Sequence, residues 1–326
     1  MHALATAPGN LLINGKFLPG LWTRLHGMPA GTPIPCPVWA QTFAADRWRV
    51  RYAKPSGGDV AQACSTEILD AVSTAMILEI RGGAGVAQEI FIGQNIEADE
   101  ALNYRRPLRF SALVKCQHPR QTHCIAALEI GSPKMVDLFD SSVETAQRTP
   151  LPALSVNRWT RIEATVKASA FRATGLRVDL AFPSDFLNEP AARVLLTDAS
   201  LACASTALAE RPPALERFLA GRFLQRHDGT SVNAIGRALT CNPHEIFFQF
   251  SFPEMRAIPA CTISQDNADL CVYSTDGQPQ SGFAYDVTFG SRTSVIIRAT
   301  KLRHQLRDGY LAFRGYRGAI LLDAEL

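Results

Sequence analysis

Short runs of residues along this chain alternate between apolar and polar side chains. In RIEATVKA, residues 161–168, Ile162 and Val166 fall on one face, and GLRVDLAFP, residues 175–183, repeats the pattern. Because side chains of a strand point alternately to the two faces of its sheet, such runs predict strands buried on one side. Further runs of strand length are AMILEIRGG, QEIFIGQNIE, LRFSALVKC and CIAALEIG. Many short strands separated by turn residues, without alternating helices, are typical of an antiparallel sandwich or barrel.

One segment has helical periodicity instead. PPALERFLAGRFLQRH opens with Pro212-Pro213, which favours a helix start, and Gly221 weakens the helical pattern. A length of 326 residues suggests two domains. We therefore expect a linking helix at 212–226, between a larger β-domain at 10–211 and a smaller β-sandwich at 227–326. The apolar face of that helix would consist of Leu215, Phe218, Leu219 and Phe223.

Composition restricts the partners only weakly. Hydrophobic residues make up 47% of the chain, enough for real cores, and the net charge of +3 identifies no partner. No run of about 18 apolar residues occurs, so we expect no membrane insertion. The first ten residues, MHALATAPGN, lack the basic and apolar regions of a secretory signal.

The eight cysteines are scattered and form no CxxC pair, so we expect mostly buried free thiols. In KCQHPRQTHC, residues 115–124, two strands flank a turn at Pro119-Arg120. A metal site, a Cys116–Cys124 disulfide and a solvated hairpin tip are the three alternatives. Strand alternation sends His123 and Cys124 to opposite faces, so we predict no zinc at His118 and His123.

Several motifs occur in an order that resembles phage tail-fibre and spike proteins. NLLINGKF, FAADRW and FIGQNIE resemble a jelly-roll module similar to carbohydrate-binding modules, and Asn14-Gly15 is expected to form a turn at the first strand. The segment 192–227 resembles the last strand, exit and short helix of such fibres. FSFPEMRAIPACTIS and the terminal LLDAEL resemble parts of tail-fibre C-terminal domains.

This resemblance implies a jelly-roll β-sandwich at 10–211, preceded by an attachment peptide at 1–9. It implies a virion protein, a tail fibre, tail tip or capsid spike, assembled in the host cytoplasm as a homotrimer with other virion proteins. The expected function is recognition of a host-surface polysaccharide, with no enzymatic activity. Two alternatives stay open: a structural virion component whose jelly roll mediates assembly only, and a glycan-degrading enzyme.

The resemblance also implies a structural calcium ion between the first and last strands of the jelly roll, with Asp198 as a ligand. The expected acidic partner in the first strand is replaced by Leu18. No other cofactor is expected.

The candidate binding residues lie in two places. Between Ser291 and Arg317, basic residues are interleaved with aromatic ones against a single acid, Asp308, which suits an acidic sugar polymer. Single-stranded nucleic acid, a solvated strand face and a subunit interface are the alternatives, and we expect no nucleic acid. Trp48 and Trp159 are expected in the core. The glycan-binding candidates are Arg303, Arg307, Tyr310, Arg314 and Tyr316, together with Trp22 and Trp39 in the loop-like segment 19–41.

Overall fold

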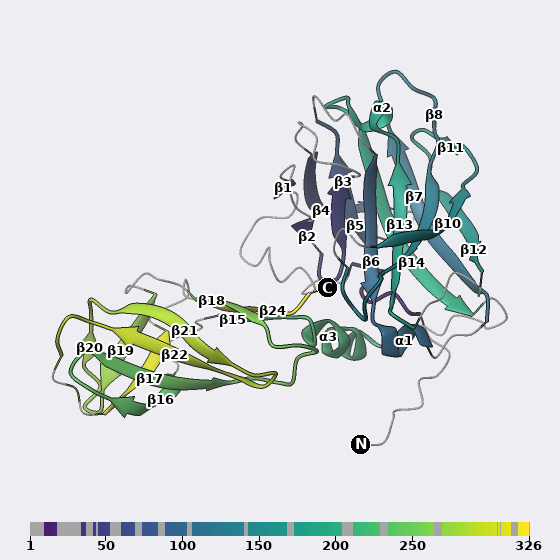
Figure 1. The fold of residues 1–326 in the computed structure, drawn as a ribbon. Helices are drawn as coiled ribbons and strands as arrows, with labels where there is room; N and C mark the ends of the chain where they lie inside the picture. The colour runs from purple at the N-terminus through teal and green to yellow at the C-terminus, as the bar shows by residue number, and fades with distance from the viewer. Residues whose placement is uncertain are drawn as a thin grey trace. The chain divides into compact units, whose positions relative to one another are not determined.

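The chain divides into two compact units, with the boundary between Ala220 and Gly221. In the computed structural model, the described residues are 10–17, 34–36, 42–43, 45–52, 60–68, 74–83, 89–102, 106–139, 143–167, 173–203, 211–228, 234–263, 269–304, 306, 308–313 and 319–325. Antiparallel strands dominate both units (Figure 1). The predicted all-β fold, with a jelly-roll sandwich and a second, smaller β-sandwich, is confirmed. No described helix is long and apolar enough to cross a membrane.

The N-terminal unit contains two six-stranded antiparallel sheets and a short ribbon of two strands. One sheet has the order β1 (Ile34–Cys36), β4 (Val60–Ile68), β5 (Thr74–Arg81), β14 (Arg193–Cys203), β7 (Leu108–Gln117) and β12 (Thr160–Val166). The other has the order β10 (Glu144–Pro150), β9 (Ala127–Ser132), β13 (Leu176–Phe182), β6 (Ile90–Ile96), β3 (Arg49–Tyr52) and β2 (Thr42–Phe43). The ribbon pairs β8 (His123–Cys124) with β11 (Leu154–Ser155). Two short helices, α1 (Ala98–Leu102) and α2 (Ser184–Leu187), connect strands.

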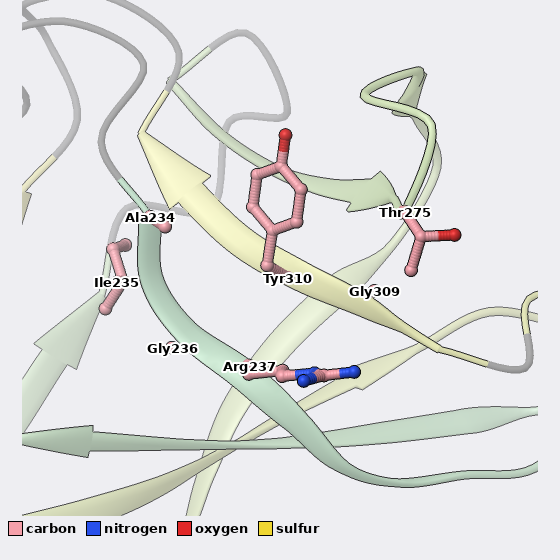
Figure 2. A pocket seen from close by; sticks show the side chains of 7 residues that line it. All are labelled: Ala234, Ile235, Gly236, Arg237, Thr275, Gly309 and Tyr310. Atoms are coloured by element: carbon pink, nitrogen blue, oxygen red, sulfur yellow. The ribbon is translucent and has the colours of Figure 1, made fainter.

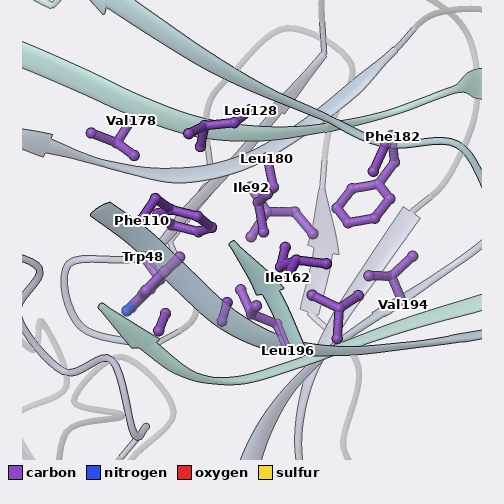
Figure 3. Packing of buried hydrophobic residues seen from close by; sticks show 14 of the residues in the cluster. Trp48, Ile92, Phe110, Leu128, Ile162, Val178, Leu180, Phe182, Val194 and Leu196 are labelled. Atoms are coloured by element: carbon purple, nitrogen blue, oxygen red, sulfur yellow. The ribbon is translucent and has the colours of Figure 1, made fainter. Parts of the chain in front are cut away.

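The core of this unit lies between its two large sheets. Figure 3 shows Leu180 and Ile92 from one sheet beside Ile162 and Leu196 from the other. All four side chains are at most 2% exposed. Ile162 and Leu180 belong to RIEATVKA and GLRVDLAFP, so the alternation predicted from these two runs supplies part of the core.

Trp48 lies in this core as expected, whereas Trp159 does not. Trp48 is 2% exposed, its indole Nε1 donates to the Asn14 carbonyl at 3.0 Å, and its ring lies 5.1 Å from that of Phe17. Trp159 is only half-buried, and the Lys115 Nζ lies 6.0 Å from the centre of its ring. The expectation of a core Trp159 was wrong, because this residue precedes β12 rather than lying within the strand.

Residues 10–17 are not a strand, which corrects the expectation drawn from NLLINGKF. Asn14 has a φ of 55°, and Phe17 N donates to the Asn14 carbonyl at 3.1 Å, so the expected turn is present. The segment is held irregularly: Leu11 N donates to Leu201 O at 2.7 Å, and Ile13 N donates to the Gln94 side chain at 3.0 Å. It therefore lies against the last strand of the jelly roll, β14, without joining the sheet.

A row of charged residues crosses the face of the second sheet that points away from the core. The register places Arg148 opposite Glu129, Glu129 opposite Asp179, and Asp179 opposite Gly93. Arg49 is opposite Gly93 on the other side, and its Nη2 lies 2.9 Å from Asp179 Oδ1. Gly93 has no side chain, so the Asp179 carboxylate can lie across it and reach Arg49.

The helix that closes the N-terminal unit is shorter than predicted. Helix α3 runs from Pro213 to Gly221, and strand β15 (Leu224–Asp228) begins inside the range expected to be helical. The helix ends early for two reasons. Gly221 has low helix propensity, and Leu224–Asp228 pair as a strand with β24 (Ala319–Asp323).

The C-terminal unit consists of a three-stranded and a seven-stranded antiparallel sheet that enclose one core. The small sheet has the order β15, β24 and β18 (Ala260–Ile263). The large sheet has the order β20 (Pro279–Gln280), β19 (Leu270–Ser274), β23 (Gly309–Phe313), β16 (Ala234–Cys241), β17 (Glu245–Ser251), β22 (Ser294–Thr300) and β21 (Ala284–Gly290).

Candidate functional site

An open pocket of about 360 Å³ lies on strands β16 and β23 of the C-terminal unit, next to the turn after β19 (Figure 2). We call it the tyrosine pocket. Two of its lining residues are glycines at close approaches between strands. A Cβ on Gly236 would lie 2.3 Å from Gln249 O, and one on Gly309 would lie 2.5 Å from Tyr273 O. Its lining residues are Ala234, Ile235, Gly236, Arg237, Thr275, Gly309 and Tyr310.

Three neighbouring strands place a stacked tyrosine pair and a cation in one row. Tyr310 on β23 is directly opposite Tyr273 on β19 and, on its other side, directly opposite Arg237 on β16. The two tyrosine rings are stacked, with centroids 5.3 Å apart and planes 6° from parallel. Tyr273 is 6% exposed and covers one face of the half-buried Tyr310 ring. The other ring face is thus left on the side of Arg237 and the pocket.

The Tyr310 ring is held rigidly while its polar end is accessible. Figure 2 shows the ring standing away from strand β23, with the hydroxyl oxygen at its outer end. Stacking on a buried tyrosine fixes the orientation of the ring, so that little conformational freedom remains to be lost when a ligand binds. The side chain therefore has the properties of a preformed stacking platform.

Arg237 is an exposed cation that pairs with Asp308. Its Nη2 donates to Asp308 Oδ2 at 2.6 Å, and the two side chains are 80% and 37% exposed. The hydrogen bond from Arg237 lowers the pKa of Asp308, and the Gly309 backbone N–H, 2.8 Å from Asp308 Oδ1, lowers it further. An exposed pair of this kind contributes about 0–1 kcal/mol, so an anionic ligand can compete with Asp308 for the guanidinium.

Of the residues predicted from sequence to bind glycan, Tyr310 lines the pocket. Arg303 is exposed in the segment after β22 and does not line the pocket. Arg307, Arg314, Tyr316, Trp22 and Trp39 lie outside the described residues.

The basic excess between Ser291 and Arg317 is smaller in three dimensions than in sequence. Arg298 bonds to Asp286 and to Glu245, because β22 pairs with β21 and β17, which carry these acids. Arg292 lies 3.0 Å from Glu254. Acidic residues from neighbouring strands thus neutralise part of the segment, which the linear count could not show.

No sequence pattern identified Arg237, Thr275 or Tyr273 as a binding residue. Arg237 and Tyr273 lie far from Tyr310 in the chain and meet it only through strand pairing. One signal was present: in DLCVYSTDG, Tyr273 alternates with the core residue Val272 and is thereby assigned to the opposite face of its strand. The sequence does not give the strand register, so it could not show that Tyr310 lies beside Tyr273 on this face.

Asp198 lies in a β-bulge of β14, close to the first described segment of the chain. It has a φ of 49°, and the neighbouring Ala199 N donates to Gly15 O at 2.9 Å. Its Oδ2 lies 2.5 Å from Arg161 Nη2. The guanidinium supplies the positive charge that a calcium ion would supply, so the carboxylate does not fit a metal ligand in this arrangement. No group of three or more metal-ligating side chains occurs among the described residues. Calcium binding at Asp198 is thus implied by the resemblance alone, and the ion pair with Arg161 counts against it.

The two histidines of KCQHPRQTHC have separate surroundings. His118 Nδ1 accepts hydrogen bonds from the backbone N–H groups of Arg120 and Gln121, at 3.0 and 2.9 Å. His123 Nδ1 lies 3.0 Å from the Thr122 hydroxyl. His118 thus holds the turn together.

Comparisons with known proteins identify no family. No protein-family model matches the chain, and no curated protein does. Among solved structures, it is similar to the C-terminal family 22 carbohydrate binding module of Clostridium thermocellum Xyn10B, with a TM-score of 0.33, 10% identity and coverage of 52% of this chain and 97% of that one. A putative sugar binding protein from Bacteroides thetaiotaomicron gives a TM-score of 0.34 and 11% identity, with 60% and 99% covered.

A third similar structure is the enzymatically active domain of tailspike protein 4 from bacteriophage CBA120, with a TM-score of 0.34 and 11% identity. The match covers 59% of this chain and only 21% of the tailspike chain. At these TM-scores, functional assignment rests on the residues of this chain itself.

Proposed function

We propose that the protein binds carbohydrate without cleaving it and that the tyrosine pocket is a binding site. The observation that carries this proposal is the row Tyr273–Tyr310–Arg237. A sugar ring presents a face of C–H groups that can pack on an aromatic ring, while its hydroxyl groups need hydrogen-bonding partners. The face of Tyr310 turned away from Tyr273 offers the first, and Thr275 and Arg237 offer the second.

The class of sugar that this site suits best is an acidic one. The guanidinium of Arg237 can form two parallel hydrogen bonds with a carboxylate or phosphate of the ligand, in place of its bond to Asp308. Arg303 and the other basic residues of the C-terminal segment would add long-range attraction. A host-surface acidic polysaccharide is thus our proposed ligand.

The biological setting that we propose is a phage-like particle, in which the protein acts as a tail fibre, tail tip or capsid spike. It is supported by the order of the tail-fibre-like motifs from NLLINGKF to LLDAEL. Assembly in the host cytoplasm, contact with other virion proteins and a homotrimeric state belong to the same proposal.

A purely structural role is the second candidate, and one observation favours it. On helix α3, Leu215 and Phe218 are 41% and 65% exposed. This apolar face suits contact with another protein as well as contact between copies of this chain. An enzymatic role has less support: hydrolysis of a glycosidic bond needs two carboxylates, and the lining residues of the tyrosine pocket include none.

Binding of the full-length protein to acidic and neutral polysaccharides, measured by calorimetry, tests the proposal. Arg237→Gln should weaken binding of the acidic polymer by up to about tenfold and reduce its salt dependence. Arg292→Gln is the matched control, since Arg292 also pairs with an exposed acid but lies outside the pocket. Equal losses in both variants, or release of reducing sugar by the parent protein, would contradict the proposal.

A further inference from the structure

Cys116 and Cys124 lie on either side of the turn held by His118 in the N-terminal unit. Cys116 is near the end of β7 and Cys124 is in β8. His118 accepts two backbone hydrogen bonds within the turn, and its ring lies 4.9 Å from that of the buried Phe186. The turn that brings the two cysteines together is thus fixed at its centre.

Residues 154–157 bind both arms of this turn. Cys124 is paired with Leu154, and Val156 N donates to Thr122 O at 3.0 Å. Asn157 N donates to Cys116 O at 2.7 Å. One short stretch of backbone therefore holds the Cys116 and Cys124 backbones beside one another.

The two side chains share the same interior. Cys116 is 0% and Cys124 1% exposed, and both belong to the main core of the N-terminal unit. Both are free thiols, and the Cys124 side chain is the largest cause of the raised pKa of Cys116, so the two side chains lie near each other. The two thiols therefore lie in the same apolar core, on the two arms of one turn.

We propose that Cys116 and Cys124 form a modification site, at which a peroxide converts two neighbouring thiols into an intramolecular disulfide. One sulfur attacks hydrogen peroxide as its thiolate; the O–O bond breaks, a sulfenic acid forms and hydroxide leaves, taking up the released proton as water. The second sulfur then attacks the sulfenic sulfur, the S–O bond breaks and a second water leaves. The two thiols lose two electrons and two protons, and the peroxide is reduced to two waters.

The surroundings of the thiols predict that this reaction is slow in the folded protein. The hydrogen bond with Cys124 raises the pKa of Cys116, and burial raises it further. Because the thiolate is the attacking species, its low population at neutral pH slows the first step, and a higher pH should accelerate it. The site therefore suits a protein that folds in a reducing compartment and meets oxidant only later.

Mass spectrometry of the full-length protein tests this directly. Trypsin cleaves after Lys115, Arg120 and Lys134, so that peptides 116–120 and 121–134 each contain one of the two cysteines. The reduced protein is treated with hydrogen peroxide at pH 8, free thiols are alkylated, and the digest is mapped. We expect peptides 116–120 and 121–134 joined by a disulfide, with the loss of two hydrogens and no alkylation at either cysteine.

A second arm removes the effect of burial. The protein is refolded from denaturant in a glutathione redox buffer, where both thiols are accessible before folding. The same linked peptides should appear, and the oxidised protein should melt about 5 °C above the reduced one, because a closed loop restrains the unfolded chain. Recovery of both peptides alkylated in both arms, or linkage of Cys116 to a different cysteine, would overturn the proposal.

Two variants separate the pair from other cysteines. Cys124→Ala should lose both the linked peptides and the redox-dependent change in melting temperature. Cys271→Ala is the matched control, because Cys271 is also buried but its thiol donates to the Gln280 carbonyl at 3.2 Å. It should retain both effects. If Cys124→Ala fails to fold, the peptide map of the parent protein still decides the outcome.

Discussion

Two glycines allow segments that are distant in sequence to lie close together. A Cβ at Gly15 would lie 2.0 Å from Ala199 O, and one at Gly93 would lie 1.9 Å from Val178 O. Real Cβ atoms do not approach backbone oxygen so closely, so any larger residue would force the backbone apart. The role of Gly15 is therefore close approach, while the positive φ of the turn belongs to Asn14.

Replacement of Gly15 tests this distinction. We expect Gly15→Ala to lower the free energy of unfolding of the N-terminal unit by about 2–4 kcal/mol, because the methyl group meets backbone atoms that cannot rotate away. Gly221→Ala is the control: nothing lies within 4 Å of its added Cβ, and it ends a helix, so stability should be unchanged or rise by about 0.5–1 kcal/mol. Chemical denaturation measures both. Equal effects would contradict the close-approach role.

The buried Asp179 gives the N-terminal unit a predictable dependence on pH. Burial alone would raise the pKa of Asp179, but the positive charges of Arg49, Arg51 and Arg177 outweigh burial and lower it. A carboxylate with a lowered folded-state pKa stabilises the protein above its unfolded-state pKa of about 3.9, and this stabilisation is lost as the pH falls through the folded-state pKa. We expect the melting temperature to fall steeply below about pH 4.

Asp179→Asn should remove most of that acid dependence and lower the free energy of unfolding at pH 7 by about 3–5 kcal/mol, because it removes the buried carboxylate that Arg49, Arg51 and Arg177 share. Asp198→Asn, at the exposed pair with Arg161, should cost only about 0–1 kcal/mol. Thermal melts between pH 3 and pH 7 measure both variants. If the melting temperature of Asp179→Asn falls with acid as steeply as that of the parent protein, other groups cause the pH dependence.

At the scale of elements, the bulge of β14 accounts for the position of Asp198. The pairing of β14 with β7 shifts between Thr197 and Ser200, which turns the Asp198 carboxylate towards Arg161 on β12. With this carboxylate neutralised by Arg161, we expect a chelator such as EDTA to leave the melting temperature unchanged. A fall in melting temperature that added calcium reverses would show that the metal site implied by the resemblance to carbohydrate-binding jelly rolls exists.

The positions of strands were easier to predict from sequence than the pairing between strands. The alternation in RIEATVKA and GLRVDLAFP correctly assigned the core faces of β12 and β13, because a period of two follows from strand geometry alone. The strand expected at NLLINGKF was wrong, because its apolar residues form an irregular segment that packs against β14. The tyrosine pocket was only partly predictable: Tyr310 was identified, but Arg237 and Tyr273 become its neighbours through a register that no local pattern encodes.

The exposed face of helix α3 carries a prediction about the whole molecule. Leu215 and Phe218 remain exposed, whereas Phe223, expected on the same apolar stripe, is buried and belongs to the C-terminal unit. We expect a homotrimer by light scattering at micromolar concentration, and Phe218→Glu should reduce the mass to that of the monomer. A monomeric mass for the parent protein would contradict the trimer proposal.

The central claim, that this protein binds carbohydrate through Tyr310, is tested most directly by a single pair of variants of the full-length protein. Tyr310→Ala removes the stacking platform and should weaken binding of an acidic polysaccharide at least tenfold, a loss of about 1.4 kcal/mol or more. Phe289→Ala is the control, because Phe289 is an aromatic residue of the same unit that is 65% exposed and outside the pocket. Calorimetric titration should show unchanged affinity in Phe289→Ala and at least tenfold weaker affinity in Tyr310→Ala. Unchanged affinity in a folded Tyr310→Ala protein would contradict the claim and direct attention to Trp22 and Trp39.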